Sequence, residues 1–184
     1  MSAVFDEHRI ALADAFACAA HYAVGQKRKY TFAPYIVHPR AVAAILRDVP
    51  GMETEDIMTG LLHDVVEDTL VPLSVIHDMF GEKVARKVWF LTSPKNGLKR
   101  SDRNAATRKR FEEADANTQT DKVADLFENH HSIHRYDPDF AVVYNQEALE
   151  LLDVMDKADP ELSARCRAIL TAAFPPEDPS CTTI

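Results

Sequence analysis

The chain has 184 residues, of which 46% are hydrophobic and 27% are charged, and this balance indicates one ordinary globular domain. Its formal net charge of −8 argues against general nucleic-acid binding, which depends on many contacts between cations and phosphates, but allows a small phosphorylated ligand held by a local cluster of cations. The sequence contains neither an apolar run near the ~20 residues that cross a bilayer nor a secretion signal, so we expect a cytoplasmic protein without a membrane partner.

Apolar residues recur at helical spacing along almost the whole chain, and no stretch alternates with the period of two that marks a half-buried strand. We therefore predict an all-α fold, a compact helical bundle. The first helix is expected from Asp6 to about Val24, where Gly25 ends it. The second is expected from Pro39 to about Asp48, because proline suits the first position of a helix.

The segment between these two helices begins with the basic run Lys27-Arg28-Lys29 and continues through an extended connector that contains Pro34. A short run of charges is most often a solvated loop. Taken alone, this segment therefore predicts a connector rather than a binding site.

The helix expected next, over about Glu53–Thr69, carries two polar pairs in an apolar run, His63-Asp64 and Glu67-Asp68. Residues four apart stack on one helix face, which places His63 over Glu67 and Asp64 over Asp68. A His-Asp dipeptide by itself is more often a surface pair or a cap than a metal site. Three acids and a histidine on a half-buried helix are costly, however, unless a cation compensates them. Imidazole and carboxylate together suit a divalent ion, at which a second acidic pair can activate water.

Further helices are expected over residues 73–80, 82–92, 117–129, 139–155 and 160–174, followed by a proline-rich tail over 175–184 that is expected to be mobile. Residues 95–110 contain seven cations and a single acid, Asp102. Such a segment is usually a solvated basic loop and half-helix. The alternative is a lid whose cations hold a polyphosphate over a metal ion.

Four blocks of the chain resemble, in the same order, the motifs of the hydrolase domain in RelA/SpoT-type alarmone enzymes, a branch of the HD metal-dependent phosphohydrolases. The blocks are Gly25-Gln26-x-Arg28-Lys29, Pro34-Tyr35-Ile36-x-His38-Pro39, His63-Asp64-Val65-Val66-Glu67-Asp68-Thr69 and Lys122-x-Ala124-Asp125-x-x-x-Asn129. The resemblance implies an HD-type helical bundle over residues 1–174, with a metal site between its helices. No stretch remains that could form the synthetase half of a bifunctional alarmone enzyme.

The resemblance also implies a metal shell of two imidazoles and two carboxylates, formed by His38, His63, Asp64 and Asp125. This donor set suits Mn²⁺, with Fe²⁺, Co²⁺ or Zn²⁺ as alternatives, because affinity order alone does not select the physiological ion. Glu67 is the candidate base for the attacking water. Asp68 would assist Glu67 or protonate the leaving oxygen, since neighbouring carboxylates can divide these roles.

Substrate contacts follow from the same resemblance. Arg28 and Lys29 become candidates for stacking on the base and for phosphate contact, to which the planar, permanently charged arginine is well suited. The other candidate contacts are Lys122, Asn129 and Ser132. Two positions depart from the family pattern, because Leu126 and His131 stand where it usually has basic residues. These departures leave the metal site intact and put the phosphate contacts in doubt.

The implied reaction is removal of pyrophosphate from guanosine 3′-pyrophosphates, which returns GDP or GTP. A second reading is an HD phosphohydrolase for another nucleotide, such as an adenosine alarmone, a deoxynucleoside triphosphate or the 2′-phosphate of NADPH. The altered stretch from Leu126 to Ser132 motivates that reading. A third is a non-enzymatic interaction module, which would normally have lost one of the ligands or acids. The sequence does not predict an oligomeric state.

Overall fold

The computed structural model describes residues 4–93, 97 and 99–172 and is all-helical, as predicted. Ten helices lie within the described residues: α1 (Glu7–Ala23), α2 (Val37–Arg47), α3 (Thr54–Leu62), α4 (Val65–Asp68), α5 (Leu73–Phe80), α6 (Glu82–Leu91), α7 (Arg100–Glu112), α8 (Ala116–Tyr136), α9 (Pro138–Leu152) and α10 (Pro160–Ala172). None of them is both long and apolar enough to cross a membrane. The tail expected over 175–184 lies outside the described residues.

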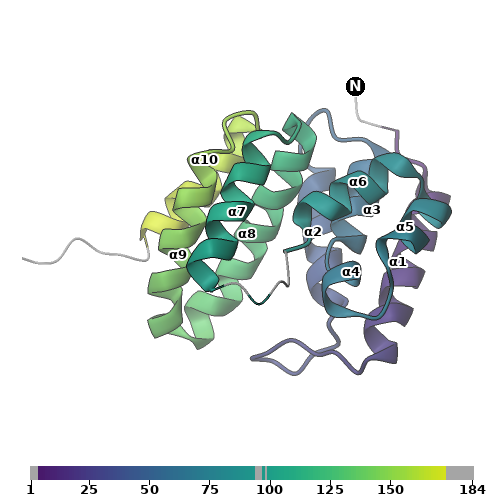
Figure 1. Cartoon of the computed structure of the whole chain (residues 1–184), viewed down its shortest axis with the longest axis horizontal. Coiled ribbons are helices and arrows are strands. Elements are labelled where there is room, and N and C mark those ends of the chain that lie inside the picture. The colour runs from purple at the N-terminus through teal and green to yellow at the C-terminus, as the bar shows by residue number, and fades with distance from the viewer. Residues whose placement is uncertain (1–3, 94–96, 98, 173–184) are drawn as a thin grey trace, which may run out of the picture.

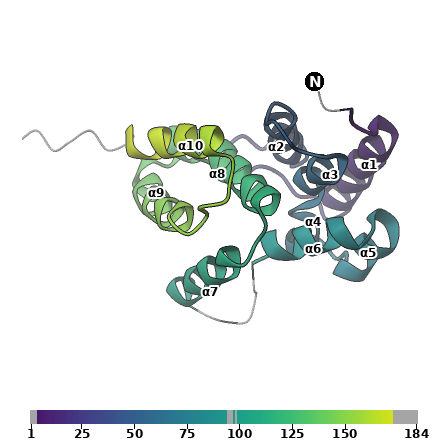
Figure 2. The ribbon, with the colours of Figure 1, turned by 90° about the horizontal axis from the view of Figure 1, so that it is seen from above.

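The helices form two groups joined by α8. Figure 1 shows α1–α6 on one side of the molecule and α7–α10 on the other. Helix α8 packs against α9 and α10 and also against α2. In the view from above in Figure 2, α8 lies between α9 and α10 on one side and α2 and α3 on the other. Helix α3 lies against both α1 and α2. The side chains that α2, α3 and α8 turn toward one another therefore meet in the middle of the bundle.

The sequence predicted one unbroken helix over 53–69, and this was wrong. Helix α3 ends at Leu62, a turn follows at His63 and Asp64, and α4 is a single turn. The physical reason lies in the side chain of His63, whose Nδ1 donates to the carbonyl oxygen of Gly60 at 2.9 Å. That carbonyl would accept a backbone N–H in a continuing helix. The break lets His63 and Asp64 turn inward together.

A buried ion cluster connects α3, α6 and α8. The ammonium group of Lys87 on α6 contacts a carboxylate oxygen of Asp56 on α3 and lies 3.0 Å from Asp121 Oδ2 on α8. All three residues are buried. Charges away from water are retained only when they are paired with good geometry, so this cluster fixes the position of α8 relative to α3.

Gly60 allows α2 and α3 to approach closely. A methyl group at this position would lie 2.9 Å from Leu46 Cδ1 and 3.3 Å from the Ala43 backbone. We expect Gly60→Ala to lower the free energy of unfolding by about 1 kcal/mol, because a mid-range overpacking cost of about 2 kcal/mol exceeds the gain in helix propensity of about 1 kcal/mol. Urea denaturation would measure the loss. Adding Leu46→Val should recover part of it, and an unchanged or raised stability of Gly60→Ala would contradict the prediction.

Candidate active site

Two histidines and an aspartate from three helices meet in the interior. His38 stands in the first turn of α2, His63 directly follows α3, and Asp125 lies on α8. All three are buried, with exposed fractions of 0%, 2% and 5%. The two Nε2 atoms lie 3.2 Å apart, and Asp125 Oδ1 lies 3.2 Å from that of His38 and 3.6 Å from that of His63. Their ligand atoms all fall within 4.8 Å of one another, close enough to share one ion.

Asp64 adds a fourth donor to this group. Its Oδ2 atom lies 3.0 Å from His63 Nε2 and 3.5 Å from His38 Nε2. Donors bound at ~2.1 Å to one centre are separated from their neighbours by roughly 3.0–3.4 Å in octahedral or tetrahedral geometry. The spacing of Asp64 Oδ2 from the two imidazoles therefore fits a shared divalent cation, although Asp64 stands outside the group of three whose ligand atoms all lie within 4.8 Å of one another. The break between α3 and α4 turns Asp64 toward the imidazoles.

The two rings present the correct nitrogen atoms for such a cation. His63 Nδ1 donates to the Gly60 carbonyl, and His38 Nδ1 donates to a carboxylate oxygen of Glu128. A carbonyl and a carboxylate accept hydrogen bonds, so each Nδ1 carries a hydrogen. Both Nε2 atoms are thereby directed at the shared centre.

The electrostatics of the group favour positive charge there. Burial alone would lower the pKa of His63, but the carboxylates of Asp64 and Asp125 raise it well above its ordinary value. For Asp125, burial alone would raise the pKa of the carboxyl group. The charge of Lys122 and the two imidazoles instead hold that pKa well below its usual range. An environment that stabilises a proton on the imidazoles this strongly also attracts a metal ion, which displaces that proton on binding.

Each carboxylate of the group has an outer partner that orients it. Tyr35 Oη donates to Asp64 Oδ2 at 2.6 Å. Lys122 Nζ lies 2.6 Å from Asp125 Oδ2, and Asn129 Nδ2 donates to Asp125 Oδ1 at 2.7 Å. Lys122 and Asn129 were predicted as substrate contacts, but in the structure both contact Asp125, a candidate metal ligand. The sequence assigned no role to Tyr35, whose place three residues before His38 was the available signal.

Removing the Tyr35 hydroxyl should weaken cation binding. Burial raises the pKa of Tyr35, so its hydroxyl stays protonated and donates to Asp64. Losing an outer partner of a metal ligand typically weakens metal affinity by about 10- to 100-fold, and we expect Tyr35→Phe to fall in this range. Isothermal titration with Mn²⁺ would measure it, with Tyr22→Phe on the exposed side of α1 as the control. Equal affinities in the two variants would show that the hydroxyl is dispensable.

The two predicted catalytic acids have different partners. Glu67 is half-buried on α4, and its Oε2 accepts the backbone N–H of Ser93 at 2.7 Å. Burial raises its pKa, and the nearby Asp64 charge adds to this, against the opposing hydrogen bond from Ser93. Asp68 is exposed, and its Oδ2 accepts from Gln26 Nε2 at 2.8 Å. Glu67 therefore has the raised pKa that suits a general base.

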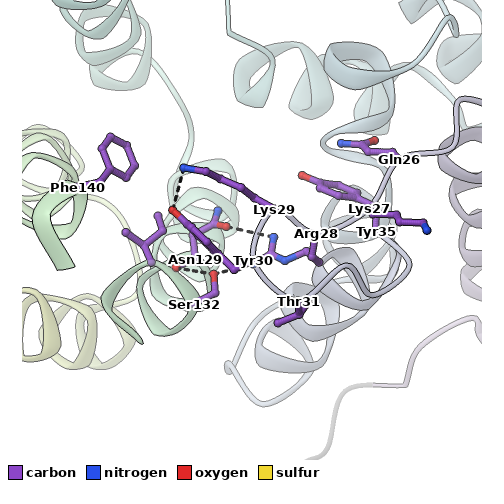
Figure 3. A pocket seen from close by; sticks show the side chains of 11 residues that line it. Gln26, Lys27, Arg28, Lys29, Tyr30, Thr31, Tyr35, Asn129, Ser132 and Phe140 are labelled. Carbon is purple, nitrogen blue, oxygen red and sulfur yellow. Dashed lines mark hydrogen bonds between the residues drawn. The ribbon is translucent and has the colours of Figure 1, made fainter. Parts of the chain in front are cut away.

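Beside the metal-ligand group lies a pocket of about 340 Å³, drawn in Figure 3. Arg28 lies across one wall, where its Nη2 donates to Ser132 Oγ at 3.0 Å and its Nη1 to Asn129 Oδ1 at 3.4 Å. Lys29 reaches the other wall, 3.1 Å from Asp137 Oδ2. The structure thus brings the predicted contacts Arg28, Asn129 and Ser132 together, whereas Lys29 pairs with an acid that the sequence did not single out.

The basic segment is helical from Arg100 onward, where α7 begins, and Lys95 lies outside the described residues. Arg100 forms two bonds to Glu147 on α9, at 2.6 and 2.7 Å, and Arg108 bonds Glu150 at 2.8 Å. Arg100 also lines a second pocket, together with Glu67. These contacts attach α7 to α9, so Arg100 and Arg108 are paired with acids and not only solvated. The role of this helix as a lid remains a prediction.

The two departures from the family pattern have different surroundings. Leu126 is buried, and the pocket that it lines also contains Lys122. His131 is exposed on α8, with its Nδ1 hydrogen-bonded to the Phe127 carbonyl at 3.0 Å. Leu126 has thus become part of the core, while His131 faces solvent, away from the four candidate ligands.

Comparisons with known proteins agree with this geometry. A model of the HD domain family matches residues 13–129. A probable guanosine-3′,5′-bis(diphosphate) 3′-pyrophosphohydrolase of Synechocystis is 46% identical over 71 residues, which are 39% of this chain and 9% of that protein. The bifunctional (p)ppGpp synthase/hydrolase SpoT of Escherichia coli is 33% identical over 124 residues, 64% of this chain and 17% of that protein. The chain thus spans less than a fifth of the length of these relatives.

Solved structures share the fold. A metazoan ortholog of SpoT, described as hydrolysing ppGpp, superposes with a TM-score of 0.81 over 92% of this chain and 98% of its own, at 23% identity. A Listeria monocytogenes protein gives 0.62 over 74% of this chain and 98% of its own, at 28% identity. The family match covers more than half of the chain and contains all four candidate ligands. This chain therefore belongs to the HD domain family.

Proposed function

We propose that this chain is a metal-dependent hydrolase that removes the 3′-pyrophosphate from guanosine tetra- and pentaphosphate, giving GDP or GTP and pyrophosphate. The observation that supports the proposal is the buried group of His38, His63 and Asp125, with Asp64 in contact with both imidazoles. The names of the relatives supply the substrate, since several are (p)ppGpp hydrolases. The proposal extends that activity to this shorter chain.

His38, His63, Asp64 and Asp125 would hold the cation, for which Mn²⁺ is our choice and Fe²⁺, Co²⁺ or Zn²⁺ the alternatives. A bound divalent ion lowers the pKa of water and polarises a phosphoryl oxygen. The side chains themselves supply orientation: the hydroxyl of Tyr35 and the ammonium of Lys122 fix the carboxylates of Asp64 and Asp125.

Glu67 would accept the proton of the attacking water, because its raised pKa favours proton uptake and the Ser93 N–H holds one of its oxygens in place. The new bond joins the water oxygen to the phosphorus attached to the ribose 3′-oxygen, and the bond from that phosphorus to the 3′-oxygen breaks. The leaving 3′-oxygen takes a proton, for which Asp68 is the candidate donor. Asp68 bonds Gln26, which lines the pocket of Figure 3, so it lies on the side where the nucleoside would sit.

The pocket of Figure 3 suits the nucleoside. Its volume of about 340 Å³ falls in the range of small-ligand sites. Arg28 offers a planar guanidinium for stacking on the base, and Lys29 offers a cation at the rim. The second pocket is lined by the candidate base Glu67 and by the cations Arg100 and Arg103, which could contact phosphate groups of the substrate.

The alternative is hydrolysis of another nucleotide. The buried Leu126 favours it, because an apolar side chain stands where the alarmone hydrolases usually carry a cation. Guanine itself is not specified by the donor set, so an adenosine alarmone, a deoxynucleoside triphosphate or NADPH remains a competing substrate.

Incubating the purified, Mn²⁺-loaded protein with guanosine and adenosine pyrophosphates, deoxynucleoside triphosphates and NADPH tests the proposal. We expect pyrophosphate and GDP from guanosine tetraphosphate, and the same products at a greatly lowered rate from the Glu67→Gln variant. Hydrolysis confined to deoxynucleoside triphosphates or NADPH would refute the guanosine assignment. Absence of activity on the whole panel would favour a non-enzymatic module.

A further inference from the structure

Glu128 connects the candidate metal centre to the nucleotide pocket. It lies on α8, three residues after Asp125, and its side chain is 20% exposed. One of its oxygens, Oε2, accepts from His38 Nδ1 and also lies 3.2 Å from Arg28 Nη2. The same carboxylate oxygen therefore contacts a candidate metal ligand and a residue that lines the pocket of Figure 3.

The contact with Glu128 determines which nitrogen of His38 faces the cation. A carboxylate at Nδ1 requires a hydrogen on that nitrogen, which leaves Nε2 as the atom available to a metal. Nε2 is indeed the atom that lies 3.2 Å from both His63 Nε2 and Asp125 Oδ1. For His63 the Gly60 carbonyl has the same effect at 2.9 Å, so each ring depends on one acceptor.

The surroundings of Glu128 keep its carboxylate in this position. Arg28 is largely buried, with 12% of its side chain exposed. Its Nη2 also donates to Ser132 Oγ, and its Nη1 donates to Asn129 Oδ1, both on α8. An arginine held by three acceptors on one helix face is itself fixed, and it in turn restrains the carboxylate oxygen that it contacts. Arg28 therefore holds Glu128 from the side of the pocket, while Glu128 accepts the hydrogen bond of His38 on the side of the metal-ligand group.

We propose that Glu128 is a positioning residue that fixes the tautomer and orientation of His38 for cation binding. This inference rests on the proposed metal-dependent function, because it assigns a role toward the same ion. Glu128 does not join the ligand shell, since it contacts the ring nitrogen on the far side of His38. Its effect on catalysis would arise entirely through the affinity for the cation.

The test is a titration of chelator-stripped protein with Co²⁺, followed by visible absorption and carried out without nucleotide. Glu128→Met removes the acceptor, and we expect it to weaken Co²⁺ binding by about 10- to 100-fold. Glu128→Gln keeps an acceptor oxygen of the same reach and should recover most of the affinity. Glu161→Met, an exposed acid on α10, serves as the matched control and should bind like the unchanged chain.

The two Glu128 variants separate a hydrogen bond from a simple loss of charge, because both lose the same charge and only one keeps an acceptor. Equal losses in Glu128→Met and Glu128→Gln would assign the effect to charge and overturn the proposal, as would unchanged affinity in Glu128→Met. Thermal melting without Co²⁺ shows whether each variant folds, and Glu128→Ala replaces the Met variant if that one does not. Since no substrate is used, a failure here is distinct from a failure to hydrolyse guanosine tetraphosphate.

Discussion

Replacing Glu67 with glutamine is expected to lower the rate of pyrophosphate release by about 10²- to 10⁴-fold, the range typical for loss of a general base. Glutamine has nearly the same size and keeps an oxygen that can accept the Ser93 N–H, so α4 should retain its position. What it loses is the capacity to take a proton from water. Burial and the neighbouring Asp64 charge, which raise the pKa of Glu67, mark it as the acid adapted to this task.

Cation binding should survive in the same variant. Among the described residues, the group whose ligand atoms all lie within 4.8 Å of one another consists of His38, His63 and Asp125. Asp64 lies outside this group but contacts both imidazoles, whereas one oxygen of Glu67 accepts the Ser93 N–H. Measuring kcat with guanosine tetraphosphate and metal content side by side therefore separates chemistry from binding. Full activity in Glu67→Gln would show that another group acts as the base. Loss of the metal in this variant would show that Glu67 is a metal ligand.

His63→Ala and Asp125→Ala are expected to lose the cation itself, and activity with it. Each change deletes a donor atom, so the loss of affinity should exceed the roughly 10- to 100-fold typical of removing an outer partner. Metal analysis of the purified variants measures the occupancy. His134→Ala, an exposed histidine on α8, is the control for His63 and should retain the metal. Unchanged metal content in both ligand variants would show that the ion binds elsewhere.

The Asp125 variant needs a further check on folding. In the unchanged chain, Asp125 Oδ2 lies 2.6 Å from Lys122 Nζ. Alanine at position 125 would therefore remove this partner from the partly buried ammonium group of Lys122. Asp125→Asn keeps the size of the side chain and one acceptor oxygen. A melting curve close to that of the unchanged chain, combined with a low metal content, would attribute the loss to the donor atom rather than to unfolding.

The all-α fold was predictable because helical periodicity is a local property of the sequence. Most helix bounds were close, as for the first helix, expected over Asp6 to Val24 and observed over Glu7–Ala23. The break after Leu62 was not predictable in this way, since it depends on a side chain that competes for a backbone carbonyl. Periodicity alone cannot indicate where such competition ends a helix.

The candidate site was predictable as far as its motifs reached. His38, His63, Asp64 and Asp125 were named from three of the four blocks of sequence, and the structure brings them together. Contacts between side chains from different helices could not be predicted from the sequence. Glu128 contacts His38 across 90 residues of chain, a relation that no spacing within α8 reveals. The roles of all these residues remain predictions until they are tested.

The most direct test is a crystal grown with Mn²⁺ and measured at the manganese absorption edge. We predict one anomalous peak per chain, about 2.1 Å from His38 Nε2, His63 Nε2 and a carboxylate oxygen each of Asp64 and Asp125. A peak at another position, or the lack of any peak at saturating Mn²⁺, would contradict the proposed metal centre and the reaction derived from it.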